Sequence, residues 1–304
     1  MKQKSIKSIR QEFRKGGVFY TPPELAKKLK EYVDISVKTV YDPTCGAGNL
    51  LRVFDDDVEK YGQEIDAEQL HGIDIPNFHG AAGNTLMCDA FPDMKFDCIV
   101  ANPPFSVKWE PDKLADDPRF SAAPVMAPPS KADWAFMQHI LYHLSDEGVA
   151  VALEFPGILY RGQREGKIRQ WFIENNYIDR VVNVPGNTFE DTAIATCLIV
   201  LRKNRTTTDI VIENDGMSRP VPLEEIAQNS YVLSPSTYVS QEPESVSIEP
   251  DQVKSDARKG FLENLRTTLD VEVLVSSLDG GSIQPFIDDI KKIVAEYDMQ
   301  QEGE

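Results

Sequence analysis

The feature that most limits the fold of this chain is the alternation of short apolar runs with helical stretches between residues 38 and 203. Six runs have the length and composition of strands: residues 38–43, 69–75, 96–104, 148–155, 178–185 and 193–203. Three stretches show the apolar spacing of helices: residues 49–61, 131–145 and 163–176. This alternation predicts βαβ units, and hence an α/β fold with a doubly wound, mostly parallel sheet. The loop between the last two strands is too short for a helix, so we expect that pair to be antiparallel.

The composition changes outside this region. Residues 1–17 form a basic leader, and a helix is expected from about Pro22, with Thr21 as its N-cap. Residues 106–130 hold five prolines and little periodicity, which predicts a long loop. We therefore expect the α/β domain at residues 18–205, an irregular extension or linker at 206–260 and a helical segment at 261–304.

The charge and the cysteines limit the function. The net charge is −17 over 304 residues. Because affinity for duplex nucleic acid comes largely from neutralising phosphates, a nucleic-acid binder of this charge needs its basic residues on one face or a partner that supplies them. No apolar run approaches the ~18 residues of a membrane span. The cysteines lack a CxxC pair and metal-ligand spacing with histidine, so we expect free thiols, a reducing cytoplasm and no metal: Cys45, Cys88, Cys98 and Cys197.

A glycine-rich turn, DPTCGAGNL at residues 42–50, follows the first predicted strand. Gly46 and Gly48 let the backbone turn tightly and approach a ligand, at the sheet edge where doubly wound folds bind nucleotides. The spacing is not G-x-G-x-x-G, because Leu51 stands where the third glycine would be, and it is not a P-loop. A phosphate-binding dinucleotide loop and a plain turn remain alternatives. Asp42 could accept a hydrogen bond from an ammonium group, and together with the motifs that follow it favours a methionine-derived cofactor over NAD.

Two acids downstream are candidates for contacts with a nucleoside. Asp74 ends the second predicted strand, where an acid can hold both ribose hydroxyls. Asp89 could accept a hydrogen bond from the adenine amino group of the same ligand, although Asn84 is a competing choice. Taken alone, Asp74 is a common residue at the end of a strand.

The most informative motif is Asn-Pro-Pro-Phe at residues 102–105, which follows an apolar strand. The side-chain oxygen of Asn102 and the carbonyl of Pro103 can accept hydrogen bonds from an exocyclic amine and free its lone pair, and consecutive prolines fix the backbone for this purpose. Phe105 can stack on a base, which must be flipped out of a duplex to reach such a pocket. In isolation the motif is more often a strand-ending turn. Its position after the glycine-rich turn favours catalysis.

These motifs resemble those of the N6-adenine DNA methyltransferases, and most closely the modification subunit of type I restriction-modification systems. The resemblance rests on FYTPPELA, DPTCGAGNL and NPPF, and continues through residues 128–144, 157–179 and 184–204. Their order and spacing match over residues 16–205, and residues 231–239 are similar to a later part of the family. The motifs after residue 128 are more specific to this family than NPPF.

The resemblance implies S-adenosyl-L-methionine as the cofactor and a seven-stranded class I methyltransferase domain at residues 18–205. One group is expected at the methionine end of the cofactor: Phe19, Tyr20, Thr21 and Pro22. The turn that lies against it comprises Asp42, Pro43, Thr44, Cys45, Gly46, Ala47, Gly48 and Asn49. Asp74 is expected to bind the ribose and Asp89 the adenine. The catalytic motif is Asn102, Pro103, Pro104 and Phe105. Phe189 matches an aromatic residue near the flipped base, although a core phenylalanine under a loop explains it equally well.

The chain departs from the family before and after its first motif. The usual subunit has a large helical domain before FYTP, where this chain has about sixteen residues, and the segment between Asp74 and residue 96 is short. We interpret the chain as a compact prokaryotic or phage-encoded variant without that helical domain. Its expected partners are DNA and a specificity-type subunit, since no target-recognition domain is recognisable. The sequence leaves the oligomeric state open, and a homodimer is among the states it allows.

Two other functions remain open. A methyltransferase acting on a protein glutamine or on RNA would use the same chemistry, but those relatives tend to have tyrosine at the position of Phe105. A non-catalytic assembly module could keep the fold, but the motifs are intact.

Overall fold

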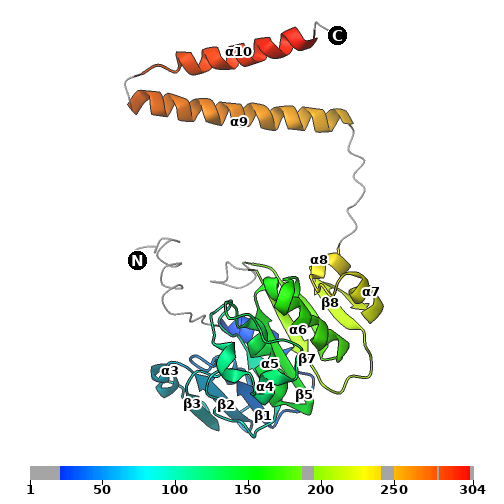
Figure 1. Cartoon of the computed structure of the whole chain (residues 1–304). Helices are drawn as coiled ribbons and strands as arrows, with labels where there is room; N and C mark the ends of the chain where they lie inside the picture. Colours follow the sequence, from blue (N-terminus) through cyan, green and yellow to red (C-terminus); the bar gives the residue numbers. More distant parts are fainter. Residues whose placement is uncertain (1–20, 187–194, 241–249, 279–280, 302–304) are drawn as a thin grey trace. The chain divides into compact units, whose positions relative to one another are not determined.

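The computed structural model describes residues 21–186, 195–240, 250–278 and 281–301. The chain divides into two compact units, Met1–Ser240 and Gln241–Glu304, which are described separately (Figure 1). The basic leader, Phe19, Tyr20 and Phe189 lie outside the described residues.

A nine-stranded sheet forms the centre of the first unit, in the order β3-β2-β1-β4-β5-β7-β6-β8-β9. The strands are β1 Thr39–Asp42, β2 Glu59–Glu64, β3 Phe78–Ala82, β4 Phe96–Ala101, β5 Leu144–Glu154, β6 Ile178–Val184, β7 Thr196–Leu201, β8 Ile210–Asn214 and β9 Met217–Val221. Strands β3, β2, β1, β4 and β5 are mutually parallel, and β7 pairs antiparallel with both β5 and β6. The doubly wound fold and the antiparallel pair are thus confirmed, with β8 and β9 added to the seven expected strands.

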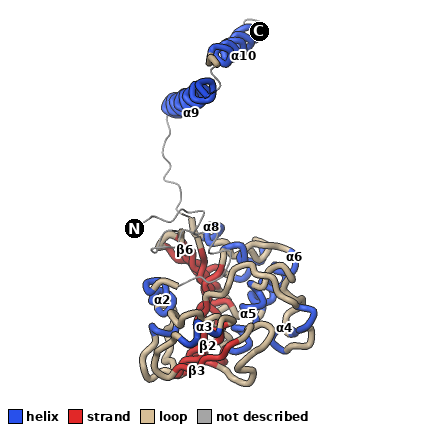
Figure 2. Tube along the Cα trace, turned by 90° about the vertical axis from the view of Figure 1, so that its left-hand side faces the viewer, coloured by secondary structure: helices blue, strands red, loops and turns tan. Residues whose placement is uncertain are grey.

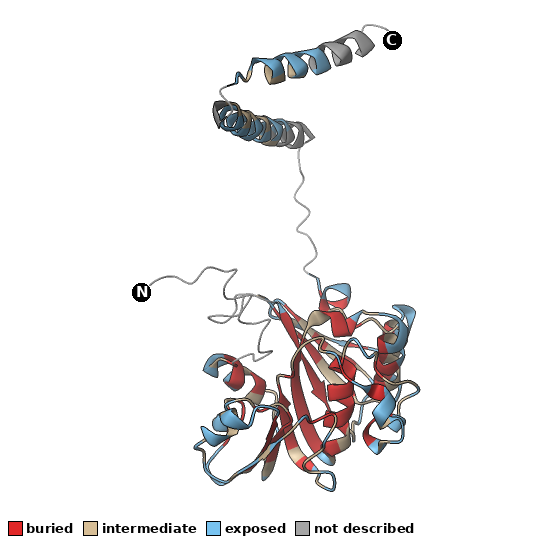
Figure 3. Ribbon diagram, turned by 60° about the vertical axis from the view of Figure 1, so that its left-hand side comes forward, coloured by how far each residue is buried: buried red, intermediate tan, exposed pale blue. Residues whose placement is uncertain are grey.

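Helices cover both faces of this sheet (Figure 2). They are α2 Pro23–Lys30, α3 Ala67–His71, α4 Pro118–Ser121, α5 Asp133–His143, α6 Gln163–Glu174, α7 Leu223–Gln228 and α8 Pro235–Tyr238. Alternate residues of β5 enter different cores: Ala150 and Ala152 pack with α5 and α6, whereas Val151 and Leu153 pack with α2. Strands buried on both faces are typical of a parallel sheet between two helical layers (Figure 3).

The predicted second strand and the helix before it are wrong. Residues 49–61 contain a short 3-10 turn, Leu51–Val53, and the start of β2, and residues 69–75 contain the end of α3 and a loop. Strand β2 has few apolar residues because its polar side chains are satisfied internally. Lys60 is 1% exposed, and its ammonium donates to the carbonyls of Asp55 and Val58.

Residues 206–240 are ordered rather than the expected irregular extension. Strand β8 pairs parallel with β6, and β9 returns antiparallel through a turn at Asp215 and Gly216. The segment is held to the sheet because Leu233 donates its backbone N–H to the carbonyl of Leu159. The α/β unit therefore extends to residue 240.

The second unit contains two helices, α9 Pro250–Leu278 and α10 Gln284–Gln301. Helices were expected at 261–304, but α9 begins earlier, within the segment expected to be a linker. Several of its apolar side chains are exposed, including Phe261 at 66% and Leu262 at 53%. Within the described ranges, none of the helices has the length and apolar character needed to cross a membrane.

Candidate functional site

A pocket lies where β1 and β4 end, at the carboxyl edge of the sheet. Its lining combines the predicted cofactor turn with the predicted catalytic asparagine: Thr21, Asp42, Thr44, Cys45, Gly46, Ala47, Asn49, Leu50, Gln69 and Asn102. Strand β2, which follows β1 in the chain, lies on one side of β1, and β4 lies on the other side. The strand order therefore reverses at the end of β1, beside this pocket. Ligands of doubly wound sheets bind at such points.

The glycine-rich turn takes the conformation that its glycines allow. Gly46 and Gly48 have φ angles of 50° and 79°, a region that favours glycine. A Cβ on Gly48 would approach the side chain of Ile73 to 3.2 Å. The N–H of Gly46 donates to the Glu64 carboxylate at 2.8 Å, which ties the turn to the end of β2.

Asp42 is the last residue of β1 and is 1% exposed. Its Oδ1 accepts the N–H of Thr44 at 3.0 Å. Burial, reinforced by the charge of Glu64, raises the pKa of Asp42 to about 7. An ammonium group placed beside this carboxyl would favour its ionised form. The site is therefore suited to the cationic end of an amino acid.

Glu64 is a neighbour of the glycine-rich turn that was not predicted from the sequence; it bonds to Gly46 but does not itself line the pocket. It is the last residue of β2, is 8% exposed, and also accepts the N–H of Asp66 at 3.0 Å. Asp74 was expected at the end of the strand next to β1, and Glu64 occupies that position in the structure. Asp74 instead lies in an exposed loop, where its backbone carbonyl accepts from Arg52. The available signal was an acid about 20 residues after the glycine-rich turn, and Glu64 follows Gly46 by 18 residues.

Asn102 directly follows β4 and faces the pocket. Its Nδ2 donates to the Thr21 hydroxyl at 3.0 Å, and the Thr21 carbonyl accepts from Asn49 at 3.1 Å. In the part of the chain that the structure describes, its Oδ1 is buried and has no hydrogen-bond partner. A buried acceptor without a donor costs free energy. This oxygen is thus available for an N–H group of a ligand.

The rest of the catalytic motif is fixed by the residue that follows it. Pro103 is buried, and Phe105 packs against the core on the α2 face. Ser106 has a φ angle of 54°, and its N–H donates to Asp133 at 3.0 Å. Its hydroxyl accepts from Arg161 at 3.3 Å. These two bonds hold the end of the motif in a backbone conformation that a serine rarely adopts.

Asp89 and Asn84, the two candidates for the adenine, are placed differently. Asp89 is not among the residues that line the pocket: it accepts from His143 at 2.8 Å and from the N–H of Phe91, on the α5 side of the sheet. Asn84 is exposed in the turn after β3, where its side chain accepts the N–H of Leu86. Asp89 therefore does not lie where an acceptor for the adenine amino group was expected.

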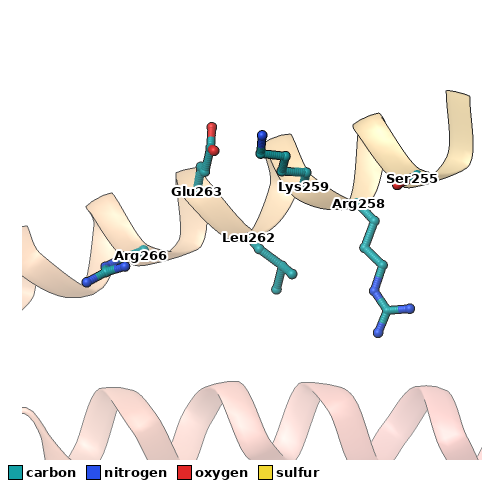
Figure 4. A pocket seen from close by; sticks show the side chains of 6 residues that line it. All are labelled: Ser255, Arg258, Lys259, Leu262, Glu263 and Arg266. Atoms are coloured by element: carbon teal, nitrogen blue, oxygen red, sulfur yellow. The ribbon is translucent and has the colours of Figure 1, made fainter. Parts of the chain in front are cut away.

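A second, shallow hollow lies on α9 (Figure 4). All of its lining comes from this one helix: Ser255, Arg258, Lys259, Leu262, Glu263 and Arg266. Its lining includes none of the predicted site residues, so the first pocket is the candidate site among the described residues.

Comparisons with known proteins show which family the chain belongs to. The family profile described as N-6 DNA Methylase matches residues 6–216. The MpnII methylase subunit of a type I restriction enzyme from Mycoplasma pneumoniae is 37% identical over 234 residues, which is 67% of this chain and 43% of that protein. The MjaIX methylase subunit from Methanocaldococcus jannaschii is 27% identical over 86% of this chain and 58% of its own length.

A solved structure gives the same result. The methyltransferase subunit of a type I restriction-modification system from Streptococcus thermophilus superposes with a TM-score of 0.65 and 32% identity, over 73% of this chain and 59% of its own. The chain spans about half the length of the curated relatives that it matches. Since the profile covers well over half of the residues, and the glycine-rich turn and Asn102 share one pocket, the chain belongs to the N-6 DNA methylase family.

Proposed function

We propose that this chain transfers a methyl group from S-adenosyl-L-methionine to the N6 amino group of adenine in DNA. The observation that carries the proposal is the unpartnered, buried Oδ1 of Asn102 in the pocket formed by the glycine-rich turn. The family membership supports both the cofactor and the substrate.

The residues of the pocket fit this cofactor. Asp42, which lines the pocket, would accept from the ammonium of the methionine portion. Glu64 does not line the pocket but bonds to Gly46, which does, and Glu64 rather than Asp74 would accept from the ribose hydroxyls. Gly46 and Gly48 leave room for the backbone to approach it. Phe19 and Tyr20 remain proposed neighbours of its methionine end, next to Thr21.

Asn102 and Pro103 would activate the amine. Their oxygens accept the two hydrogens of the adenine amino group and draw its lone pair out of the ring. When bound, the cofactor supplies an electrophilic methyl group on a sulfonium. The amine nitrogen would take this methyl group with the thioether as the leaving group, and the excess proton would pass from the nitrogen to solvent. Phe105 would stack on the flipped base.

A partner is proposed to supply sequence specificity and part of the affinity for DNA. The net charge of −17 disfavours unaided binding to a polyanion. We infer a modification subunit of a restriction-modification-like system that acts in the cytoplasm, with a specificity-type subunit beside it. The type I relatives support this assignment.

The test is a transfer assay with tritiated S-adenosyl-L-methionine and unmethylated DNA, with and without candidate specificity subunits encoded next to the gene. The expected result is labelled N6-methyladenine, which the Asn102→Ala variant does not form. Label in RNA or in protein glutamine instead of DNA would replace this substrate with one of the alternatives. Absence of cofactor binding by calorimetry at high micromolar concentrations would favour a non-catalytic module.

A further inference from the structure

A buried polar cluster lies on the α5 side of β1, opposite the pocket. We call it the Arg119 hub and define it by Tyr41, Asp89, Arg119, His139 and His143. Arg119 belongs to α4 and is only 6% exposed. The proposed transfer reaction assigns no role to these residues.

Every N–H of the Arg119 guanidinium has an acceptor. Nε donates to Asp117 at 3.0 Å. Nη1 donates to the Thr85 carbonyl at 2.7 Å and to His139 Nδ1 at 3.1 Å. Nη2 donates to the Leu86 carbonyl at 2.9 Å and to Asp117 at 2.7 Å. A planar fork with five donors meets this requirement, whereas a lysine ammonium does not.

The guanidinium also fixes the protonation of His139. Because arginine only donates, Nδ1 of His139 must accept, so its proton is on Nε2, which donates to the Tyr41 hydroxyl at 3.0 Å. Burial, together with the charges of His143 and Arg119, lowers the pKa of His139 and keeps it neutral. The hub thus reaches Tyr41, the residue before Asp42 in β1.

Three side chains of the hub have the ligand spacing of a metal site, but their ligand atoms already take part in hydrogen bonds within the protein. The ligand atoms of Asp89, His139 and His143 lie within 4.8 Å of one another. Both nitrogens of His139 are already bonded, and His143 donates to the Met94 carbonyl and pairs with Asp89. The cationic Nη1 of Arg119 lies 3.9 Å from the Asp89 carboxylate. Arg119 therefore supplies the positive charge that an ion would supply.

One branch of the hub leads to the glycine-rich turn. Arg119 holds the carbonyl of Thr85, and the Thr85 hydroxyl donates to the carbonyl of Pro43, between Asp42 and Thr44. Thr85 is 4% exposed, so this bond is shielded from water. A shift of the Thr85 backbone would therefore shift the turn.

The other branch leads to the catalytic motif. Arg119 and Asp117 lie in the segment 106–130, which begins directly after Phe105. The segment is packed: the Trp109 ring lies 5.2 Å from that of Phe120, and Trp109 Nε1 donates to the carbonyl of Pro128. Arg119 thus attaches this segment to Thr85 and Leu86, and Thr85 in turn bonds to Pro43 in the glycine-rich turn.

We propose that Arg119 is a positioning residue that couples the segment after the catalytic motif to the back of the cofactor turn, through Thr85 and Pro43. This role rests on the proposed function, since it assumes that the turn binds S-adenosyl-L-methionine. It assigns to residues 106–130 a part in holding the cofactor site in its binding conformation.

Arg169 provides a matched control. It is 2% exposed and donates to three backbone carbonyls, those of Tyr231, Ile158 and Arg161. Neither Arg169 nor these partners line the pocket. Its replacement should lower stability as that of Arg119 does, but its contacts lead through Arg161 to Ser106, after the Asn-Pro-Pro-Phe motif, and not to Thr85 or Pro43.

The test is calorimetric titration of the full chain with S-adenosyl-L-methionine, alongside the melting temperature of each variant. Arg119→Met should weaken binding roughly tenfold, which corresponds to about 1.4 kcal/mol. Arg169→Met should change the Kd by less than about twofold, even where its melting temperature falls as far. A folded Arg119→Met chain with unchanged affinity would overturn the coupling.

A second variant separates coupling from general destabilisation. Thr85→Val removes the bond to Pro43 but keeps the side-chain shape and the carbonyl that Arg119 holds. It should weaken binding several-fold, and it should lower the melting temperature less than Arg119→Met does, because one hydrogen bond is lost instead of several. In the Thr85→Val background, Arg119→Met should add little, because both act through Pro43. Wild-type affinity in Thr85→Val, or fully additive effects, would also overturn the coupling, and Thr85→Val decides the question alone if Arg119→Met does not fold.

Failure of the unsubstituted chain to bind S-adenosyl-L-methionine would overturn the proposed function and this role together. Binding by the unsubstituted chain that neither substitution weakens would overturn the role of Arg119 alone.

Discussion

Two groups of buried polar residues flank β1, and they differ in how completely they are paired. In the pocket, Asn102 has an acceptor without a partner, and burial raises the pKa of Asp42 to about 7. In the Arg119 hub, hydrogen bonds and the charge of His143 outweigh the effect of burial and lower the pKa of Asp89 to about 2. Of these two groups, the one with the unpaired acceptor lines the pocket, whereas the one with the fully bonded guanidinium lies outside it and supports the surrounding structure.

The largest effect that this comparison predicts is on turnover. Asn102→Ala removes the unpaired acceptor, so methyl transfer should fall by about a hundredfold or more, by analogy with the loss of one preorganised hydrogen-bonding group. The Kd for S-adenosyl-L-methionine should stay within about twofold. A transfer assay measures the turnover, and calorimetry measures the Kd. Equal losses of turnover and cofactor binding would show that Asn102 serves the cofactor instead.

The next largest effect distinguishes Glu64 from Asp74 as the acid that binds the ribose. Glu64→Ala should weaken binding of S-adenosyl-L-methionine by ~1–3 kcal/mol, since ribose hydroxyls and the N–H of Gly46 lose an acceptor. Asp74→Ala should leave the affinity unchanged, because its side chain is exposed. Calorimetry on both variants measures this loss of affinity. A larger loss in Asp74→Ala than in Glu64→Ala would show instead that Asp74 binds the ribose.

A smaller effect is expected on the pH dependence of binding. A bound ammonium group lowers the pKa of Asp42 below its value of about 7 in the free protein, so binding releases a proton and affinity rises with pH. The rise should be about fivefold from pH 6 to 7.5, and it should stop near pH 8, where the amino group of the ligand loses its own proton. Titration in buffers of different ionisation enthalpy measures the released proton. An Asp42→Asn variant with the same pH profile would exclude Asp42 as the source.

The smallest effect near neutral pH is expected from the hub. Because the pKa of Asp89 is lowered in the folded state, its contribution to the free energy of unfolding is complete above about pH 4 and is lost as the pH falls towards 2. The difference in melting temperature between the wild type and Asp89→Asn should narrow as the pH falls from 4 towards 2. A difference that did not narrow over this range would contradict the assignment of Asp89 as a carboxylate with a lowered pKa.

The sequence predicts the parts of this molecule that depend on local chemistry. The glycine-rich turn and the Asn-Pro-Pro-Phe motif have backbone requirements that few residues satisfy, and both occur where expected. Strand β2 was missed because its polar residues are satisfied by distant groups: Gln63 bonds to Cys88 and Ala90, which no local pattern reveals. Glu64 was not predicted because it is the last residue of this strand.

The last hairpin could have been found. Asp215 and Gly216 have φ angles of 49° and 79°, and an Asp-Gly pair between two short strands is a strong hairpin signal. The role of Asp89 could not have been inferred, because its partner His143 is 54 residues away. Pairing across that distance depends on the packing of α5 against the sheet.

The unequal exposure of the thiols makes the native chain convenient for spectroscopy. Cys45, Cys98 and Cys197 are buried, and burial raises the pKa of each thiol, so they should resist alkylation at neutral pH. Cys88 is exposed, and its carbonyl accepts from Gln63 beside the cofactor turn. A maleimide fluorophore should therefore attach at Cys88 without any engineered cysteine, and its emission should report ligand arrival in real time.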